Sequence, residues 1–332
     1  MVSKKNHSLK YLDFRESMQF LTCPKCFSVP KSSLQYKTGF LICNMCGQKY
    51  PIKNRIIQLI NPEILSKQVE NEQKGNEIPL TKKNIERFAK KDKWSKYYNH
   101  FVDQKINYLV KMLHKGDFKG IISLGSGPGF EIKEILKRKH FPLVFSSDIA
   151  FSATSIVPYT LSNIDTTVCL FTSDLNYVPV LPDKYYPILI YEALHHTESS
   201  LKTIEEMMKK KYFDILFVEP CTNFFIRILA KLGIAQRVEY SGVIPDFVDL
   251  EGVRKLAKKY RYEVNINTLW DIPEEYIRTI CKQKSKMESV LLTLIDIASS
   301  FGNLIKFGSF AIVHLQFNKK KYRHSFYKPN KG

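Results

Sequence analysis

The sequence has no run of about 18 apolar residues free of charge, so we expect no membrane-spanning helix. Its basic start, MVSKKNHSLK, is not followed by an apolar segment, and we therefore expect no secretory signal. No internal repeat is visible, which excludes solenoid and propeller architectures. These absences favour a globular protein that works in the cytoplasm.

Acidic residues are scarce relative to basic ones. The chain has 32 Asp and Glu against 51 Lys and Arg, and its formal net charge is +19. Such an excess attracts nucleic acids, acidic lipid surfaces or anionic substrates, and a solvated basic surface without a partner is the alternative interpretation. With 44% hydrophobic and 25% charged residues, the composition excludes an intrinsically disordered chain. The length of 332 residues predicts about two domains.

Cysteine is used sparingly, but four of the seven cysteines form a pattern. The segments LTCPKC and LICNMCGQKYPI each hold a C-x-x-C pair, and these pairs are Cys23 with Cys26 and Cys43 with Cys46. This spacing predicts a zinc ribbon in which four thiolates close a tetrahedral site, so the zinc should be structural. Four unrelated core cysteines are the alternative. We place a zinc-ribbon domain at residues 1–60, where a metal would compensate for a small core.

The residues around and after the second pair, CGQKYPIKNRIIQLI, support this domain. Over residues 18–60 the chain resembles the zinc-ribbon domain of the small activator subunit shared by tRNA, rRNA and release-factor methyltransferases. In that family the domain stabilises a methyltransferase partner and has no chemical role. The resemblance implies that a similar ribbon is fused here to an enzyme, with Lys53-Asn54 in place of the common Asp-Gly.

The rest of the chain divides by composition. Residues 61–82 are polar without an apolar period and predict a linker, and residues 319–332 predict a frayed basic tail. Between them, a helical pattern over 84–114 precedes alternating strand and helix signals, which are typical of a parallel sheet with helices on both faces. The predicted strands are 119–124, 143–147, 167–172, 187–192, 213–219, 262–270 and 308–318. The predicted helices are 129–140, 151–161, 199–211, 222–236 and 248–260.

The strand predicted at 119–124 runs into a glycine-rich turn in the segment IISLGSGPGF. Gly125, Gly127 and Gly129 lack a Cβ atom, so the backbone there can come close to a ligand. Asp148 ends the next strand, about 20 residues on, where a carboxylate can bind both ribose hydroxyls; a helix N-cap is the alternative. The dinucleotide fingerprint would need glycine or alanine in place of Phe130. The pattern therefore predicts a nucleoside ligand without a pyrophosphate.

This pattern resembles the class I S-adenosylmethionine-dependent methyltransferases of the small-molecule type. Four signals follow in family order over residues 83–318: LGSGPGF, then SSDIAFSAT, then the segment Thr172–Thr197, then ILFVEP. The resemblance implies a Rossmann-like α/β domain over 83–318 with a mostly parallel seven-stranded sheet and helices on both faces. It also implies S-adenosylmethionine as cofactor.

The resemblance further implies how individual residues bind the cofactor. Asp174 stands where the family's third-motif acid contacts the adenine amine, with Leu175 beside the adenine; a plain turn residue is the alternative for Asp174. Tyr191 ends the fourth strand, beneath the transferable methyl group. Ser123 stands where family members often carry a carboxylate that helps to hold the methionine amino group. Serine can accept one hydrogen bond there, so we expect altered cofactor anchoring.

Three titratable residues at strand ends are candidate catalytic groups. His195 and His196 suit general-base work near neutral pH, although in the family that the chain resembles this Leu-His-His often packs near the cofactor without acting as a base. Glu219 ends the fifth strand, at the expected mouth of the pocket, and is a candidate base or substrate contact. Methyl transfer is a direct displacement and needs a base only when the acceptor retains its proton.

Three functions remain open at this point. We favour a methyltransferase with a small-molecule or lipid-like acceptor, because apolar segments after the fifth strand, including 289–305, could form a lid or make peripheral contact with a membrane. RNA is the alternative acceptor, supported by the likeness of the ribbon and by the basic charge, although no RNA-binding module is recognised. A catalytically degenerate binding scaffold is the third interpretation, suggested by Ser123.

Overall fold

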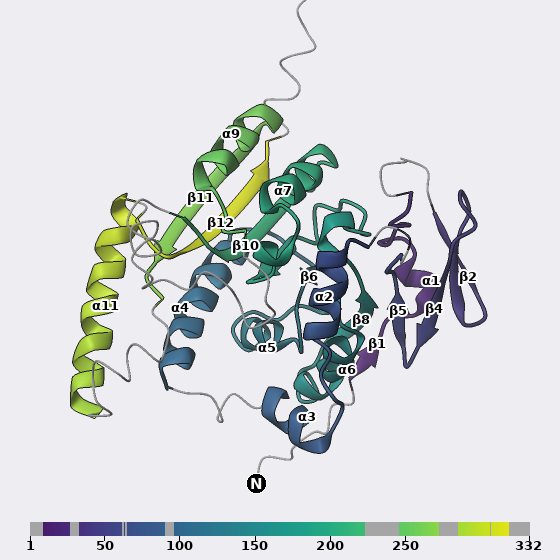
Figure 1. Cartoon of the computed structure of the whole chain (residues 1–332), viewed down its shortest axis with the longest axis horizontal. Coiled ribbons are helices and arrows are strands. Elements are labelled where there is room, and N and C mark those ends of the chain that lie inside the picture. Colours follow the sequence, from purple (N-terminus) through teal and green to yellow (C-terminus); the bar gives the residue numbers. More distant parts are fainter. Residues whose placement is uncertain are drawn as a thin grey trace, which may run out of the picture.

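The structure is a computed structural model that describes residues 9–26, 33–61, 63, 65–89, 96–222, 246–271, 285–305 and 307–318. Its central strands are β6 (Gly120–Leu124), β7 (Leu143–Asp148), β8 (Thr167–Thr172), β9 (Ile188–Tyr191), β10 (Asp214–Pro220), β11 (Tyr262–Leu269) and β12 (Phe310–Phe317). They form a sheet in the order β8-β7-β6-β9-β10-β12-β11 (Figure 1). The first five of these strands are parallel, and β12 pairs antiparallel with both β10 and β11. The mostly parallel seven-stranded sheet that the sequence predicts is confirmed.

Helices cover both faces of this sheet. One face packs against α4 (Lys96–Leu113), α5 (Phe130–Leu136) and α6 (Phe151–Thr160). The other packs against α7 (Ser200–Lys209) and α9 (Leu250–Tyr260). Consecutive strand residues point to opposite faces. Ile121 therefore belongs to the core cluster that includes α4, α5 and α6, and Ile122 belongs to the cluster that includes α7 and α9. Because both faces are covered, the strands read as almost continuous apolar runs.

The predicted ribbon extends the central sheet. It comprises β1 (Lys10–Tyr11), α1 (Phe14–Ser17), β2 (Leu34–Lys37), β3 (Phe40–Cys43), β4 (Lys49–Lys53) and β5 (Ile56–Gln58). Strands β2 to β5 form an antiparallel meander, and both β5 and β1 pair parallel with β8. The ribbon therefore covers the edge that β8 would expose. The domain boundaries at residues 60 and 83 stay a prediction.

The segment expected to be a linker contains a helix. Residues 61–82 include α2 (Lys67–Gly75), which begins after Ser66, whose hydroxyl accepts a hydrogen bond from the Val69 N–H at 3.3 Å. The sequence did not predict this helix, because α2 has Val69 as its single apolar residue and so shows no apolar period; the role of the segment as a linker between domains stays a prediction. The helical pattern over 84–114 overlaps α3 (Lys82–Ala89) and contains α4, and residues 90–95 between them lie outside the described residues.

The C-terminal part supplies the last helix of the described chain, α11 (Ser285–Ile305). It packs beside α4 and the end of β11, where the Trp270 N–H donates to the Ser299 hydroxyl at 3.0 Å (Figure 1). Within the described residues, α11 is the one helix long and apolar enough to cross a membrane by length and composition, with 22% of that window buried. The helix predicted at 222–236 lies, from residue 223 on, outside the described residues, as does the predicted tail.

Candidate functional site

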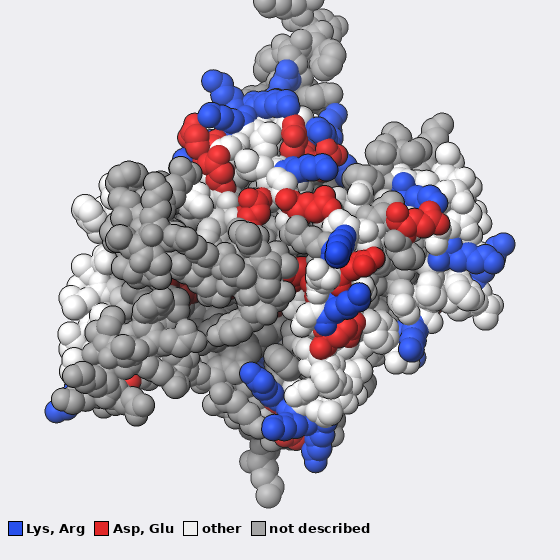
Figure 2. All heavy atoms as spheres, in the orientation of Figure 1, with Lys and Arg blue, Asp and Glu red and all other residues white. Residues whose placement is uncertain are grey.

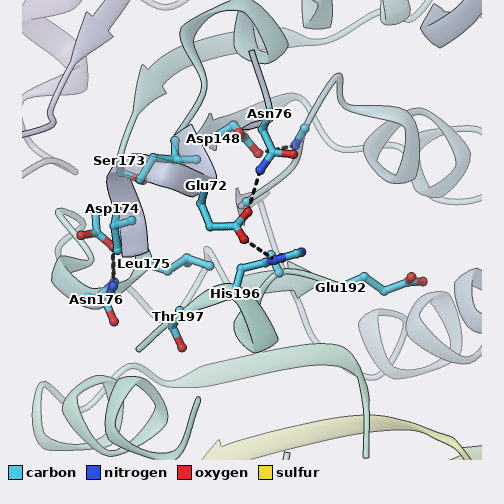
Figure 3. Close-up of a pocket in the computed structure, with 15 residues that line it drawn as sticks. Glu72, Asn76, Asp148, Ser173, Asp174, Leu175, Asn176, Glu192, His196 and Thr197 are labelled. Carbon is cyan, nitrogen blue, oxygen red and sulfur yellow. Dashed lines mark hydrogen bonds and ion pairs between the residues drawn. The ribbon is translucent and has the colours of Figure 1, made fainter. Parts of the chain in front are cut away.

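Four parallel strands end at one edge of the sheet, where the segments after them form a pocket of about 210 Å³. The glycine turn follows β6 and Asp148 ends β7, while Asp174 follows β8 and Glu192 follows β9. Gly125 and Gly127 of the turn line the pocket. The three acidic residues line it as well (Figure 3). Ligands of open parallel sheets bind at this edge. The size of the pocket suits an organic ligand better than a single ion.

The glycine turn has a backbone that other residues rarely adopt. Gly125, Gly127 and Gly129 have φ values of +66°, +48° and +78°. A Cβ atom on Gly125 would lie 2.4 Å from the Cβ atom of Ala193, so the turn and the β9 loop pack too closely for any side chain. Gly129 is the left-handed N-cap of α5. The pocket is thus bordered here by bare backbone.

Asp148 is buried and holds the glycine turn. Its Oδ2 accepts the Gly127 N–H at 2.8 Å, and its Oδ1 accepts the Ala150 N–H at 2.9 Å. Burial raises the pKa of Asp148, and the two amide donors oppose that shift. Each carboxylate oxygen can accept a second hydrogen bond, so two ribose hydroxyls can be bound as well. The N-cap of α6 is Ala150, so Asp148 does not occupy that position.

Asp174 leaves one buried oxygen without a partner. Its Oδ1 accepts both the backbone N–H and the side-chain amide of Asn176, each at 2.8 Å. Its Oδ2 is buried and has no hydrogen-bond partner in the described part of the chain. Burial raises the pKa of this carboxyl. A buried acceptor without a hydrogen bond costs about 1–3 kcal/mol of stability, and a donor on a ligand would remove this cost. Through Oδ1, Asp174 also caps the N-terminus of η3 (Leu175–Tyr177).

One wall of the pocket comes from α2, which the sequence analysis missed. Glu72 lies on this helix, Asn76 is its C-cap, and both line the pocket. The Asn76 amide donates to Glu72 Oε2 at 3.0 Å, and Glu72 Oε1 lies 3.4 Å from His196 Nδ1 (Figure 3). Glu72 is almost fully buried. The helix that follows the ribbon therefore reaches over the site and contacts one of the candidate catalytic residues.

The three candidate catalytic residues occupy two different places. His196 lines the pocket at the end of η4 (Leu194–His196). His195 is buried, and its Nδ1 lies 2.6 Å from Glu219 Oε2. The expectation that Glu219 lies at the mouth of the pocket is wrong, because it is fully buried and its Oε1 accepts the N–H groups of Ala193 and Leu194, each at 2.7 Å. Glu219 thus fixes the turn that carries both histidines.

A buried ion-pair network lies next to the pocket. Lys105 of α4 is 2% exposed, and its ammonium lies 2.8 Å from Glu192 Oε1 and 2.5 Å from Asp271 Oδ2. The two carboxylates outweigh burial and keep the pKa of Lys105 above its usual range. Glu192 has a φ of +51°, a strained value for a residue with a side chain. Such strain is concentrated at functional sites.

The other residues predicted to bind the cofactor differ in their access to the pocket. Leu175 lines it, whereas Gly129, Ser123 and Tyr191 are not among the lining residues. Ser123 is fully buried in β6, and its hydroxyl donates to Glu131 Oε1 at 3.1 Å. Tyr191 is half-buried at the end of β9. Their contacts with a cofactor stay predictions.

The four predicted metal ligands converge in the ribbon. The sulfur atoms of Cys23, Cys26, Cys43 and Cys46 all lie within 4.8 Å of one another. Those of Cys23 and Cys46 are 3.8 Å apart. A tetrahedron with metal–sulfur bonds of about 2.3 Å has edges of about 3.8 Å, so this cluster can hold one metal ion. The Tyr50 hydroxyl lies 3.0 Å from the Cys23 sulfur and orients it.

Comparisons with known proteins add neighbours of low similarity. No family model matches the sequence, and no curated protein matches it. Among solved structures, the small RNA methyltransferase HEN1 is 12% identical with a TM-score of 0.47, over 65% of this chain and 25% of that one. Magnesium protoporphyrin IX methyltransferase from Synechocystis PCC 6803 is 11% identical with a TM-score of 0.45, over 77% and 99%. Phosphoethanolamine N-methyltransferase 2 from Haemonchus contortus is 10% identical with a TM-score of 0.41, over 65% and 53%.

Proposed function

We propose that this chain is an S-adenosylmethionine-dependent methyltransferase that acts on a small-molecule or lipid-like acceptor. The observation that carries this proposal is the pocket at the ends of β6, β7 and β8, where a bare glycine turn meets two buried carboxylates. Asp148 can accept two ribose hydroxyls, and the unpartnered Oδ2 of Asp174 can accept the adenine amine. The sequence resemblance implies the nucleoside, and the two carboxylates supply acceptors for its ribose hydroxyls and its adenine amine, which supports the proposal.

The side chains present divide the remaining work. Bound cofactor would supply an activated methyl group together with its leaving group. The protein has to align the acceptor, exclude water and, for a protonated acceptor, remove a proton. We propose His196 for the proton, because it lines the pocket and its Nδ1 lies 3.4 Å from Glu72 Oε1. His195 and Glu219 act as positioning residues for the turn.

Calorimetry with cofactor analogues tests the cofactor assignment. We expect the protein to bind S-adenosylhomocysteine and to bind S-inosylhomocysteine, which has a carbonyl in place of the adenine amine, at least about 100-fold more weakly, because Asp174 would then face an acceptor. Asp174→Asn, which offers an amide donor, should remove most of this preference. Absence of binding by either compound would favour the scaffold interpretation.

The acceptor proposal depends on the outer face of α11. Its exposed apolar side chains recur every three or four residues and are 46% to 79% exposed: Met287, Val290, Leu294, Ile297, Phe301 and Leu304. Of the charged residues of α11, Glu288 is buried, Asp296 lies 2.9 Å from His100 Nε2, and Lys286 lies at the N-terminal end of the helix. An uncharged face of this kind suits an apolar surface. Among the described residues on the molecular face in Figure 2, Lys and Arg are interspersed with Asp and Glu, so these residues form no single basic track for RNA.

Vesicle sedimentation and a methylation screen test this acceptor class. The wild-type chain should sediment with vesicles of phosphatidylcholine and phosphatidylglycerol, and Ile297→Glu should weaken that binding at least about tenfold by placing a charge in the apolar stripe. Tyr159→Glu, at a residue of similar exposure on α6, is the matched control and should change little. Label from the methyl donor should enter a lipid or small-molecule fraction. Label in RNA, with binding that weakens steeply in salt, would support the alternative acceptor.

We propose that the cysteine cluster holds a structural zinc ion. Four thiolates complete a tetrahedral shell and leave no position for water or substrate. The ribbon shares a core cluster with the central sheet, so its role would be to stabilise the edge at β8. Thiolate ligands need a reducing compartment, which fits the cytoplasm.

A further inference from the structure

Glu131 is a buried carboxyl beside the glycine turn that the proposed function leaves unused. It lies in the first turn of α5 and is 6% exposed. Its Oε1 accepts the hydroxyl hydrogen of Ser123 at 3.1 Å, and Ser123 is fully buried in β6, two residues before Gly125. A carboxyl group therefore lies directly behind the glycine turn, outside the residues that line the pocket, and it accepts hydrogen bonds from the Ser123 hydroxyl and from its own backbone N–H.

This region holds more carboxyl groups than cations. Burial raises the pKa of Glu131 to about 8, and the nearby carboxylates of Asp148 and Glu192, both of which line the pocket, add to that effect. Lys105 is the only buried Lys or Arg among the described residues, and it is already paired with Glu192 and Asp271. A positive group brought by a ligand would compensate this excess of acid.

We propose that Glu131 receives the α-ammonium group of the bound cofactor and that Ser123 orients its carboxylate for this contact. This inference rests on the proposed function and deepens it. An ammonium beside a buried carboxylate makes a charge-assisted hydrogen bond, which is about twice as strong as a neutral one. The amino-acid end of S-adenosylhomocysteine presents this group, whereas the adenosine end carries no cation. Glu131 is thus a binding residue for one end of the ligand.

The test compares two ligands that differ in that end. S-Adenosylhomocysteine has the ammonium, and 5′-methylthioadenosine keeps the nucleoside and the sulfur but lacks the amino-acid group. We expect Glu131→Gln to weaken binding of S-adenosylhomocysteine about 10- to 100-fold by calorimetry and to change binding of 5′-methylthioadenosine less than about twofold. Equal weakening of both ligands would mean a structural role and would overturn the proposal, as would unchanged binding of S-adenosylhomocysteine.

Further variants keep the proposal testable if Glu131→Gln does not fold. Ser123→Ala removes only the orienting hydroxyl and should weaken S-adenosylhomocysteine several-fold, with 5′-methylthioadenosine unaffected. Glu131→Asp keeps the charge and should lie between the wild type and the Gln variant. Failure of the wild type to bind either ligand would refute the cofactor itself. Equal wild-type affinity for both would leave the methyltransferase proposal standing and overturn the role of Glu131.

A pH profile supplies a readout that a structural role would not move. A bound ammonium favours the ionised form of Glu131, so binding should release a proton, and affinity for S-adenosylhomocysteine should rise between about pH 6 and pH 8 by up to tenfold per unit. The charged groups facing Glu131 from other elements are Asp148 and Glu192; Lys105 pairs with Glu192, and His196 acts on Asp148. Those groups affect 5′-methylthioadenosine as well, so its profile is the control. A slope in wild type that Glu131→Gln retains would overturn the proposal.

Discussion

Replacement of Asp148 by alanine tests the nucleoside pocket at the residue that joins the glycine turn to β7. In the proposed complex the carboxylate accepts two ribose hydroxyls, and a hydrogen bond to a charged group contributes about 1.5–3 kcal/mol. The loss of both should therefore weaken binding of S-adenosylhomocysteine by at least about 3 kcal/mol, which corresponds to more than about 100-fold in Kd. Isothermal titration calorimetry measures this directly.

The same substitution also affects the free protein. Asp148→Ala leaves the N–H groups of Gly127 and Ala150 without their acceptor, which should lower the free energy of unfolding by about 1–3 kcal/mol for each group. Urea unfolding separates this loss from the loss of binding. Asp183 is a matched control. Its Oδ1 accepts the N–H of Tyr185, two residues later, at 2.7 Å, as Asp148 does with Ala150, but Asp183 does not line the pocket. Asp183→Ala should lower stability alone. If Asp148→Ala binds S-adenosylhomocysteine as the wild type does, the pocket does not hold a ribose at this carboxylate.

Three further predictions concern the ribbon, the buried lysine and the glycine turn. Cys43→Ser should lower zinc content and thermal stability together, whereas Cys169→Ser, outside the cluster, should leave zinc content unchanged; a metal-free variant of normal stability would contradict a structural metal. Lys105→Met should lower the free energy of unfolding in urea by about 3–5 kcal/mol, because it leaves two carboxylates without their cation. A triple variant that also neutralises Glu192 and Asp271 should recover most of this loss, and no recovery would contradict the importance of the ion pairs. Gly125→Ala should destabilise the protein and displace η4, because the new Cβ atom would lie 2.4 Å from that of Ala193. Gly127→Ala places its Cβ atom in open space and should lower the free energy of unfolding by only about 1–2 kcal/mol. Equal losses of stability in the two variants would argue against the close packing of Gly125 on Ala193.

The central sheet could be predicted from sequence because its signals are local. Each strand of a doubly covered sheet is a short apolar run, and the intervening amphipathic segments differ in period. Asp148 and Asp174 could be placed beside the glycine turn for the same reason, since Asp148 ends one strand of the parallel sheet and Asp174 follows the next. The two C-x-x-C pairs predicted their own convergence, because four similar ligands at this spacing favour one tetrahedral site.

The residues that were missed depend on contacts between distant segments. Glu72 comes from a polar helix with one apolar residue, and only its packing over the pocket gives it a role. Glu131 looks like an ordinary first-turn acid of a helix, a place where carboxylates are common because they favour the helix dipole. Its burial and its bond to Ser123 depend on how α5 packs against β6. Lys105 would be assigned to a solvated helix face by sequence alone, since its two acidic partners lie 87 and 166 residues away.

The ribbon is also connected to the pocket through backbone pairing. In the register of β5 with β8, Gln58 pairs with Thr172, and the Leu59 N–H donates to the Thr172 carbonyl at 3.0 Å. Asp174 follows two residues later, and α2 leaves the ribbon to form one wall of the same pocket. Since a parallel edge strand is held by its neighbour's hydrogen bonds, loosening the ribbon should loosen the strand end that positions Asp174. Removal of metal by a chelator should therefore weaken S-adenosylhomocysteine binding several-fold before the sheet unfolds, and readdition of zinc should restore it. Unchanged affinity in metal-free, folded protein would show that the ribbon and the pocket are energetically independent.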